Sequence, residues 1–499
     1  MDAKPNILIL MADQLTATAL PAYGNTVAKT PHIDRLCERG VVFRNAYCNS
    51  PLCAPARAAF MSGRLPSATG AYDNAAEFSA DVPTFAHYLR RAGYRTVLAG
   101  KMHFIGPDQL HGFEERLTTD IYPADFEWTP DWDDFSTRPS WYHNMDSVVQ
   151  AGVCVRSNQL DFDEETAFAA RQKLFDIARD DDARPFCMAV SLTHPHDPFA
   201  IPKQYWSRYA DADIDMPRAP TPASDPHSAR LRHVCAMDGQ PITEAQVHAA
   251  RHAYYGAMSY VDDHVGRLME TLAQVGMADD TVVVLLSDHG EMLGERGLWF
   301  KMSFREGACR IPLIVHAPGR FASSVVERCV SLVDLLPTLA DLAGDGEAPA
   351  YATPLDGRSL LAHLQRTGGH DEVVGEYLAE GVVAPLVMLR RGRWKYVHCD
   401  GDPDQLFDLA ADPHELHNLT TAPELAMFQA EAARRWDFGA LRAAVVGSQR
   451  RRRLVAEALR TGALTGWDYQ PRRDAGQQYI RTHLKLDDLE AKARFPRVE

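Results

Sequence analysis

Short apolar runs alternate with amphipathic stretches along the first part of the chain. The runs Ile7–Met11, Cys187–Leu192 and Val282–Leu286 are apolar over the length of a strand, as in strands buried on both faces of a sheet. Residues 164–178 and 244–275 instead carry apolar side chains at helical spacing. This alternation predicts an α/β fold with a large, mainly parallel or mixed central sheet that is flanked by helices.

The pattern changes after residue 370. Val373–Leu378, Val387–Leu389 and Trp394–His398 are separated by glycine and charged residues, which predicts a small antiparallel sheet. The end of the chain is interpreted as a separate tail. We therefore expect three parts, namely an α/β domain over 1–370, a small α+β subdomain over 371–435 and a tail over 436–499.

Polar side chains follow the C-terminal ends of four apolar runs. Asp13, Lys101 and His196 come after three of these runs, and Asp288 and His289 come after the fourth. Open α/β sheets bind ligands at the carboxyl edge of their strands. Acid, base and imidazole groups that arrive together at this edge predict a binding or active site there.

Composition and charge narrow the classes of function. The chain of 499 residues is 46% hydrophobic and 24% charged, which is typical of a globular protein. Its net charge of -15 argues against a nucleic acid or an anionic membrane surface as the main partner. The same charge would repel an anionic substrate, so local cations must dominate such a site. We find no signal peptide or membrane span and expect a cytoplasmic protein.

Cys53 differs from the other cysteines in its surroundings. The nine cysteines form no CxxC pair, which predicts free thiols. Cys53 opens the segment CAPAR, with Pro55 in the first turn of a predicted helix. A helix N-terminus lowers a thiol pKa and favours anions, and Arg57 adds a charge one turn later. From these residues alone, Cys53 is either a reactive thiol or a half-buried thiol at a helix start.

The CAPAR segment resembles the CxPxR signature of type I sulfatases, which are members of the alkaline phosphatase superfamily. Four further segments match in family order, and Lys301 resembles the lysine that follows the last of them. These segments are PNIL before Asp13, GKMH at 100–103, PHDP at 195–198 and SDHG at 287–290. The resemblance spans about residues 4–400 and implies an alkaline-phosphatase-like fold and a sulfate ester hydrolase.

The resemblance also implies a modified residue and a metal. In this family a separate formylglycine-generating enzyme oxidises the cysteine, here Cys53, to formylglycine, and its hydrated aldehyde attacks sulfur. One divalent metal would be held by Asp13, Gln14, Cys53, Asp288 and His289. Many sulfatases have Asp at the position of Gln14 and Asn at that of His289. The resemblance favours Ca²⁺, whereas fewer carboxylates and an imidazole keep Mn²⁺ as an alternative.

Five residues at family positions would carry the remaining chemistry. Arg57 and Lys101 would orient the hydrated aldehyde, and His103 would be the base that releases sulfate. His196 and Lys301 would bind sulfate and protonate or stabilise the leaving alcohol.

Two further polar residues have alternative interpretations. Asn74 contacts the sulfate or caps a neighbouring turn. His194 lies outside the register of the PHDP segment, so we expect it to be a packed, structural histidine.

Two segments, residues 106–126 and 467–490, resemble choline sulfatases, a branch of this family. A quaternary ammonium group donates no strong hydrogen bond and is held by aromatic faces beside a carboxylate. The stretch from Phe126 to Tyr142 is rich in aromatic residues. By resemblance, the substrate pocket would contain Trp128 and His143. The counter-charge would be one of Glu376, Glu380 or Asp488, and Glu380 and Asp488 are kept as the candidate ligands.

The same resemblance implies a homo-oligomer, either a dimer or a tetramer, because the tail of choline sulfatases packs on a neighbouring subunit. The run Arg450–Arg453 would then be a subunit contact, although four arginines are also typical of a solvated helix face.

The predicted function is hydrolysis of the small-molecule sulfate ester choline-O-sulfate to choline and sulfate. A phosphonate monoester or phosphodiester hydrolase of the same superfamily is the alternative, because these enzymes share CxPxR and the Gln14 and His289 variants. A ligand-binding protein without catalysis would follow if Cys53 stayed a thiol.

Overall fold

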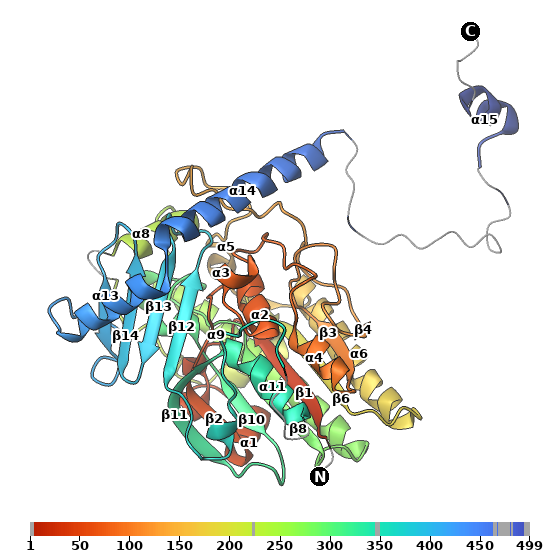
Figure 1. Ribbon diagram of the computed structural model, residues 1–499, viewed down its shortest axis with the longest axis horizontal. Helices are drawn as coiled ribbons and strands as arrows, with labels where there is room; N and C mark the ends of the chain where they lie inside the picture. The colour runs from red at the N-terminus through yellow and green to blue at the C-terminus, as the bar shows by residue number, and fades with distance from the viewer. Residues whose placement is uncertain are drawn as a thin grey trace.

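A mixed sheet of nine strands forms the centre of the molecule (Figure 1). The computed structural model describes residues 4–221, 225–344, 350–462, 467, 480 and 483–493. The strands of the large sheet are β1 (Asn6–Asp13), β2 (Val41–Tyr47), β3 (Arg95–Gly100), β4 (Glu115–Arg116), β6 (Phe186–Pro195), β8 (Thr281–Ser287), β9 (Arg310–Ile311), β10 (Leu313–His316) and β11 (Ser324–Ser331).

The strand order is β11-β2-β10-β8-β1-β6-β3-β4, and β9 pairs with β2. The strands β8, β1, β6 and β3 are parallel, whereas β10 runs antiparallel to both of its neighbours. The predicted mainly parallel or mixed sheet is therefore confirmed. Both edges of β1 pair with β8 and β6 and helices cover both faces of the sheet, so every residue from Ile7 to Asp13 is buried.

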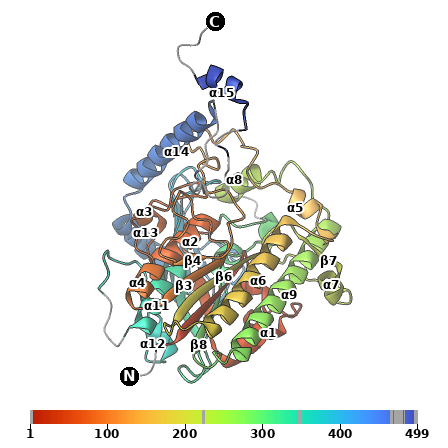
Figure 2. The same ribbon diagram turned by 90° about the vertical axis from the view of Figure 1, so that its right-hand side faces the viewer.

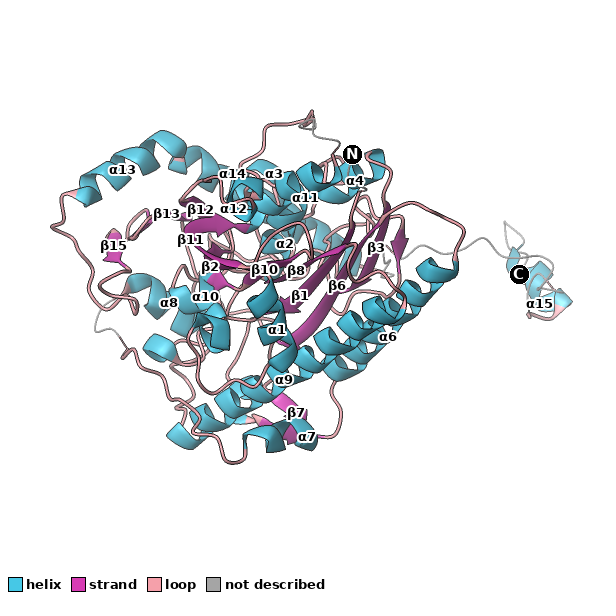
Figure 3. Ribbon diagram, turned by 90° about the horizontal axis from the view of Figure 1, so that it is seen from below, coloured by secondary structure: helices cyan, strands magenta, loops and turns pink. Residues whose placement is uncertain are grey.

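Helices cover both faces of this sheet (Figures 2 and 3). One face carries α1 (Pro31–Arg39), α6 (Asn158–Arg179) and α9 (Glu244–Gln274), and the other carries α2 (Cys53–Ser62), α4 (Phe85–Arg91) and α11 (Leu335–Ala343). Short elements in the connections are α3 (Pro66–Thr69), α5 (Asp146–Val149), β5 (Gly152–Cys154), β7 (Ala200–Pro202), α7 (Lys203–Trp206), α8 (Pro226–Val234), α10 (Glu306–Cys309) and α12 (Leu361–Leu364).

The helix α2 is buried at all its positions. Its sequence is rich in alanine, and Pro55 in the first turn removes only a backbone donor that has no partner within the helix. Gly63 ends it in the left-handed conformation, with φ of 66°, and donates its N–H to the carbonyl of Ala59. The helix thus begins at Cys53, as the sequence predicts.

The small antiparallel sheet is also confirmed. It consists of β12 (Glu372–Tyr377), β13 (Leu386–Arg391), β14 (Trp394–Cys399) and β15 (Gln405–Asp408), and α13 (Glu424–Arg435) packs against it.

The end of the chain differs from the predicted separate tail. The helix α14 (Phe438–Arg460) buries side chains such as Val445 and Arg452 against the rest of the chain. Residues 438–460 are therefore part of the main body, whereas α15 (Leu486–Ala493) stands apart from it (Figures 1 and 2). Most of the tail segment 467–482 lies outside the described residues. No helix in the described ranges has the length and apolar character that a membrane crossing requires.

Candidate active site

Four potential metal ligands meet at the carboxyl edge of the large sheet. Asp13 ends β1 and Asp288 follows β8, and the parallel pairing of these strands brings the two carboxylates together. The N-terminus of α2 points Cys53 at the same place, with its Sγ 3.2 Å from Nε2 of His289. Ligand atoms of these four residues all lie within 4.8 Å of one another.

This cluster fits a divalent cation. Oδ1 of Asp13 is buried and has no hydrogen-bond partner among the described residues. Nε2 of His289 lies 3.7 Å from this oxygen and 3.7 Å from Oδ2 of Asp288. A buried carboxylate oxygen without a partner is rare unless a cation or water completes its shell. Carboxylate and imidazole donors together suit a divalent metal ion.

Arg57 is buried and binds both carboxylates. Its Nε lies 2.8 Å from Oδ2 of Asp288, and its Nη2 lies 3.3 Å from Oδ2 of Asp13. Nη1 also donates to Oγ of Ser191 at 2.9 Å. Burial would raise the pKa of Asp288, but Arg57 and His289 lower it to about 2. Arg57 therefore orients both carboxylates and keeps Asp288 ionised.

The environment of Cys53 is strongly cationic. Lys101 forms an ion pair with Asp13, and its Nζ lies 4.4 Å from the centre of the Tyr122 ring. Burial alone would raise the pKa of the Cys53 thiol, but Lys101, Lys301 and His289 hold it well below its usual value. A site that stabilises negative charge at this side chain suits an activated nucleophile.

Lys301 and His196 form a second cationic group. Nζ of Lys301 lies 2.8 Å from Nε2 of His196 and donates to Oε1 of Gln14 at 2.6 Å. The Gln14 amide also donates to Glu291 at 2.5 Å and to Asp197 at 3.4 Å. Because its oxygen accepts from Lys301 here, the metal-ligand role of Gln14 stays a prediction.

The His103 imidazole is buried beside these groups. Neither ring nitrogen has a hydrogen-bond partner in the described ranges. Its ring centre lies 5.5 Å from that of Tyr122 and 6.0 Å from that of Trp128. The backbone, at φ of 53°, is fixed by the Asp120 carboxylate, which accepts from the His103 N–H at 2.8 Å. An unpartnered buried imidazole is free to exchange a proton with a substrate.

Asn74 caps the helix that begins at Cys53. Its Oδ1 accepts from the N–H of Ala54 at 2.9 Å, so the amide nitrogen remains as the donor for an anion near Cys53. His194 has a different place, because its Nδ1 lies 2.6 Å from Oδ2 of Asp163. The expectation of a packed, structural histidine is thus confirmed for His194.

Aromatic rings surround the open side of this cluster. The Trp128 ring centre lies 5.7 Å from that of Tyr122 and 6.3 Å from that of Trp141. His143 stacks on Phe300 at 4.5 Å and lies 6.0 Å from the His196 ring. Trp132 instead packs in the core and donates its indole N–H to the carbonyl of Ala379 at 2.8 Å.

The three candidate counter-charges have different places. Glu376 accepts from Ser67 and from the indole N–H of Trp436, so it is engaged within the protein. Asp488 is exposed in α15, and within one chain it does not reach the pocket. Glu380 is buried and close enough to Lys301 and Cys53 to sense their charges. Burial, aided by Asp73, raises the pKa of Glu380 to about 7.

Comparison with known proteins identifies the family. The model of the family described as "Sulfatase" matches residues 5–345. The chain belongs to the sulfatase family. The family resemblance of the sequence motifs is therefore confirmed. Two C-terminal models also match, "N-sulphoglucosamine sulphohydrolase, C-terminal" over 294–437 and "Choline sulfatase enzyme C terminal" over 443–495.

Individual relatives cover most of this sulfatase. It is 49% identical to the choline-sulfatase of Rhizobium meliloti (strain 1021), over 99% of each chain. It is 27% identical to an arylsulfatase of Clostridium perfringens (strain 13 / Type A), over 84% of this chain and 91% of the relative. The solved phosphonate monoester hydrolase of Agrobacterium radiobacter superposes with a TM-score of 0.67 at 26% identity, covering 88% of this chain and 96% of its own.

Several residues beside the site of this sulfatase were missed by sequence reasoning. They are Tyr122 against Lys101, Asp120 behind His103, and Asp197 and Glu291 around Gln14. Asp197 stands in the PHDP segment, and Asp120 and Tyr122 stand in the segment 106–126, but no role was assigned to these three residues. They and Glu291 lie in loops whose path the hydrophobic pattern does not define.

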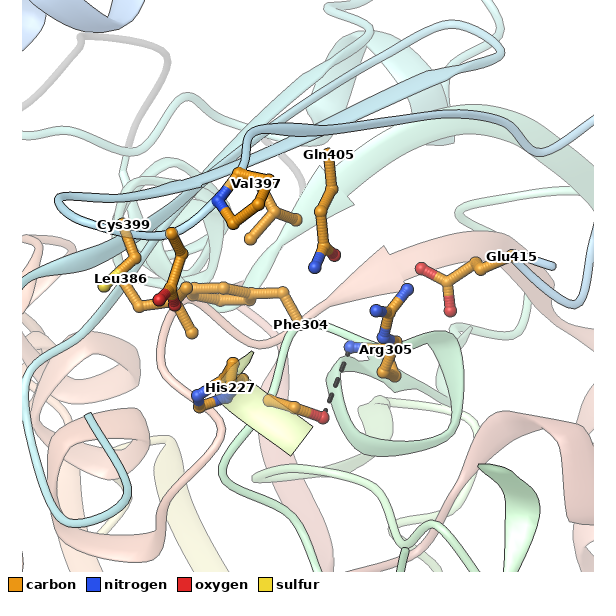
Figure 4. A pocket seen from close by; sticks show the side chains of 11 residues that line it. His227, Phe304, Arg305, Leu386, Val397, Cys399, Gln405 and Glu415 are labelled. Atoms are coloured by element: carbon orange, nitrogen blue, oxygen red, sulfur yellow. Dashed lines mark hydrogen bonds between the residues drawn. The ribbon is translucent and has the colours of Figure 1, made fainter. Parts of the chain in front are cut away.

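A small cavity lies behind the segment that follows Lys301 (Figure 4). It measures about 20 Å³, and His227, Phe304 and Arg305 are among its lining residues. His227 faces the carbonyl of Met302 at 3.0 Å, and Arg305 pairs with Asp225 at 2.8 Å. The cavity holds none of the predicted site residues, and its walls anchor the Lys301 segment.

Proposed function

We propose that this sulfatase hydrolyses choline-O-sulfate to choline and sulfate. The observation that carries the proposal is the pairing of two ends in one site. Lys101, Lys301 and His196 make one end cationic, whereas Trp128 lies beside His103 and the buried Glu380 lies within electrostatic range of Lys301 and Cys53. Choline-O-sulfate is a small zwitterion with one sulfate and one quaternary ammonium group. The 49% identity to a choline-sulfatase supports the same reaction.

At the sulfate end, Lys301 and His196 would bind the anion and serve the leaving oxygen. Nδ1 of His196 lies 2.8 Å from the carbonyl oxygen of Asp197, so the ring hydrogen belongs on Nδ1 and Nε2 accepts from Lys301. This pair would supply a proton to the departing choline oxygen. The Asn74 amide would donate a further hydrogen bond to the sulfate.

The chain's own residues would also prepare the nucleophile. Formylglycine, made from Cys53 by a separate generating enzyme, would supply the hydrated aldehyde that attacks sulfur. A divalent metal, Ca²⁺ or Mn²⁺, held by Asp13, Asp288, His289 and the side chain at 53, with Gln14 as a further ligand, would neutralise the sulfate oxygens.

Arg57, Lys101 and His103 would act on the nucleophile directly or through the ligands. Arg57 orients Asp13 and Asp288 and keeps Asp288 ionised, and Lys101 favours negative charge at position 53. His103 would take the proton from the hydroxyl at position 53, because its ring nitrogens have no partner among the described residues.

At the ammonium end, aromatic faces would replace water around the methyl groups. Trp128, Tyr122 and Trp141 offer ring faces, and cation–π contacts contribute about 0.5–2 kcal/mol each. His143 would complete the wall on the side of Phe300. Glu380 would supply the counter-charge.

We also propose a cytoplasmic homo-oligomer, a dimer or tetramer. All nine cysteines are free, which suits a reducing compartment. Leu484 and Leu486 are exposed next to and within α15, and such apolar residues suit a contact with a second subunit. Asp488 would then approach the pocket of a neighbouring chain rather than its own.

A phosphonate monoester hydrolase is the second candidate. Its support is the superposition on the enzyme of Agrobacterium radiobacter, together with the Gln14 and His289 variants.

The deciding experiment compares three substrates on one protein batch. The chain is co-expressed with a formylglycine-generating enzyme, and peptide mass measures the aldehyde at position 53. Release of choline and sulfate from choline-O-sulfate is compared with turnover of an aryl sulfate and a phosphonate monoester. We expect a strong preference for choline-O-sulfate. Preference for the phosphonate in aldehyde-bearing protein would refute the proposal and favour the second candidate.

A further inference from the structure

The helix α14 presents polar side chains on its buried face. This face consists of Val445, Val446, Gln449, Arg452 and Ala456. Gln449 and Arg452 both bond to residues that lie more than 300 positions away in the sequence. Polar groups are costly to bury on the inner face of a helix unless they are hydrogen-bonded. Their partners therefore indicate what the two side chains do.

Arg452 joins two loops of the substrate pocket. Its Nη1 and Nη2 bind the two carboxylate oxygens of Asp73, each at 2.8 Å, and Nη1 also donates to Oγ1 of Thr129 at 3.0 Å. Asp73 directly precedes Asn74, and Thr129 directly follows Trp128. The planar guanidinium fixes both loops in one geometry, which a point charge could not do.

Gln449 reaches a third loop through Trp132. Its Oε1 accepts from the backbone N–H of Trp132 at 3.1 Å. The Trp132 indole donates to the carbonyl of Ala379 at 2.8 Å, and Ala379 directly precedes Glu380. Direct bonds from α14 thus reach the loops of Asn74 and Trp128, and the bond of Trp132 to Ala379 links α14 indirectly to the loop of Glu380.

We propose that Arg452 and Gln449 are positioning residues for the substrate pocket. Arg452 holds the loops of Asn74 and Trp128, and Gln449 holds that of Glu380. The inference rests on the proposed function, because these loops form the sulfate and ammonium ends of that site. The family model "Sulfatase" ends at residue 345, whereas the choline sulfatase C-terminal model covers 443–495. This support of the pocket therefore lies in the C-terminal region.

The two residues have different expected effects. Kinetics are measured with choline-O-sulfate and with 4-nitrophenyl sulfate, which has no ammonium group. Arg452→Met should lower kcat/KM for both esters, roughly ten- to hundredfold, because the Asn74 loop serves every sulfate. Gln449→Met should raise KM for choline-O-sulfate and leave both constants for the aryl ester unchanged.

Matched variants separate positioning from general damage. Arg450 is exposed on the same helix and pairs with Asp133 at 2.7 Å, so Arg450→Met should match the wild type on both esters. Arg452→Lys keeps the charge but not the forked geometry, and its kcat/KM should fall between those of Arg452→Met and the wild type. Thermal melting reports whether each variant is folded. If Arg452→Met does not fold, the kinetic constants of Arg452→Lys test the inference instead.

Failure of this inference can be distinguished from failure of the proposed function. Wild-type kinetic constants in folded Arg452→Lys and Gln449→Met would overturn the inference. It would also be overturned if the loss of activity in each variant matched its fall in melting temperature and was the same for both substrates. If wild-type protein ignores choline-O-sulfate, the proposed function fails. The Arg452 part is then still judged on the aryl ester, where a selective loss in Arg452→Met supports it.

Discussion

The raised pKa of Glu380 predicts a pH-dependent preference for the ammonium ester. Burial and the neighbouring Asp73 raise the pKa of this carboxyl to about 7. Below this pH the group is mostly neutral, and above it the group is ionised. A quaternary ammonium binds the ionised form more tightly, so KM for choline-O-sulfate should fall as the pH rises through 7. The substrate itself does not titrate in this range.

The magnitude follows from the titration of a single group. Between pH 6 and pH 8 the ionised fraction of such a carboxyl rises from about a tenth to about nine-tenths. If only ionised Glu380 binds the ammonium group, kcat/KM for choline-O-sulfate should rise roughly tenfold from this cause. Other groups of the sulfate end act on every ester.

The assay therefore measures a ratio. The quantity is kcat/KM for choline-O-sulfate divided by kcat/KM for 4-nitrophenyl sulfate, at steps between pH 6 and pH 8 on one enzyme. Groups shared by both reactions cancel in this ratio. In Glu380→Gln the ratio should be low and independent of pH. A flat ratio in the wild type, or the same slope in Glu380→Gln, would refute the role of Glu380.

Three further predictions concern the nucleophile, the aromatic wall and the metal. Cys53→Ala should abolish turnover of every ester with little change in melting temperature, and residual wild-type rates would contradict its role. Trp128→Ala should raise KM for choline-O-sulfate about 2- to 30-fold, the equivalent of about 0.5–2 kcal/mol. The effect on KM for the aryl ester should be much smaller, and equal effects on the two esters would exclude Trp128 from the ammonium pocket. Added Ca²⁺ or Mn²⁺ should stabilise chelator-treated protein, by about 2.7 kcal/mol at a hundred times its Kd, and Asp288→Asn should weaken this shift in melting temperature; a wild-type shift in that variant would count against the metal site.

The sheet edge could be predicted from sequence because strand burial and motif position act together. The apolar residues of β1 and β8 specify central strands, and parallel pairing then brings Asp13 and Asp288 side by side. Only one more element, the short buried helix α2, is needed to bring Cys53 next to these two carboxylates. Local signals were sufficient here, since each ligand lies at the end of a regular element.

The loops and α14 could not be predicted in this way. Two of the five buried side chains of α14, Gln449 and Arg452, are polar, so hydrophobicity alone made the helix look like a solvated tail. Glu376 and Glu380 are four residues apart, yet only the fold shows that Glu376 is engaged by Ser67 and Trp436. These assignments depend on partners that are distant in the sequence.

The division between sheet edge and loops has a consequence for how specificity can change. Lys101 and Arg57 at the sheet edge are buried and both pair with Asp13, so a substitution there is expected to disturb the chemistry common to all sulfate esters. The connection that carries Trp128 is bonded directly to α14, and the one that carries Glu380 is linked to α14 through Trp132. If the proposed function holds, changes in these loops should alter recognition of the group attached to the sulfate while the charged cluster stays intact. A change of ester preference is therefore expected from the loops of Trp128 and Glu380 and from Gln449, and a loss of activity on every ester from the sheet edge and from Arg452.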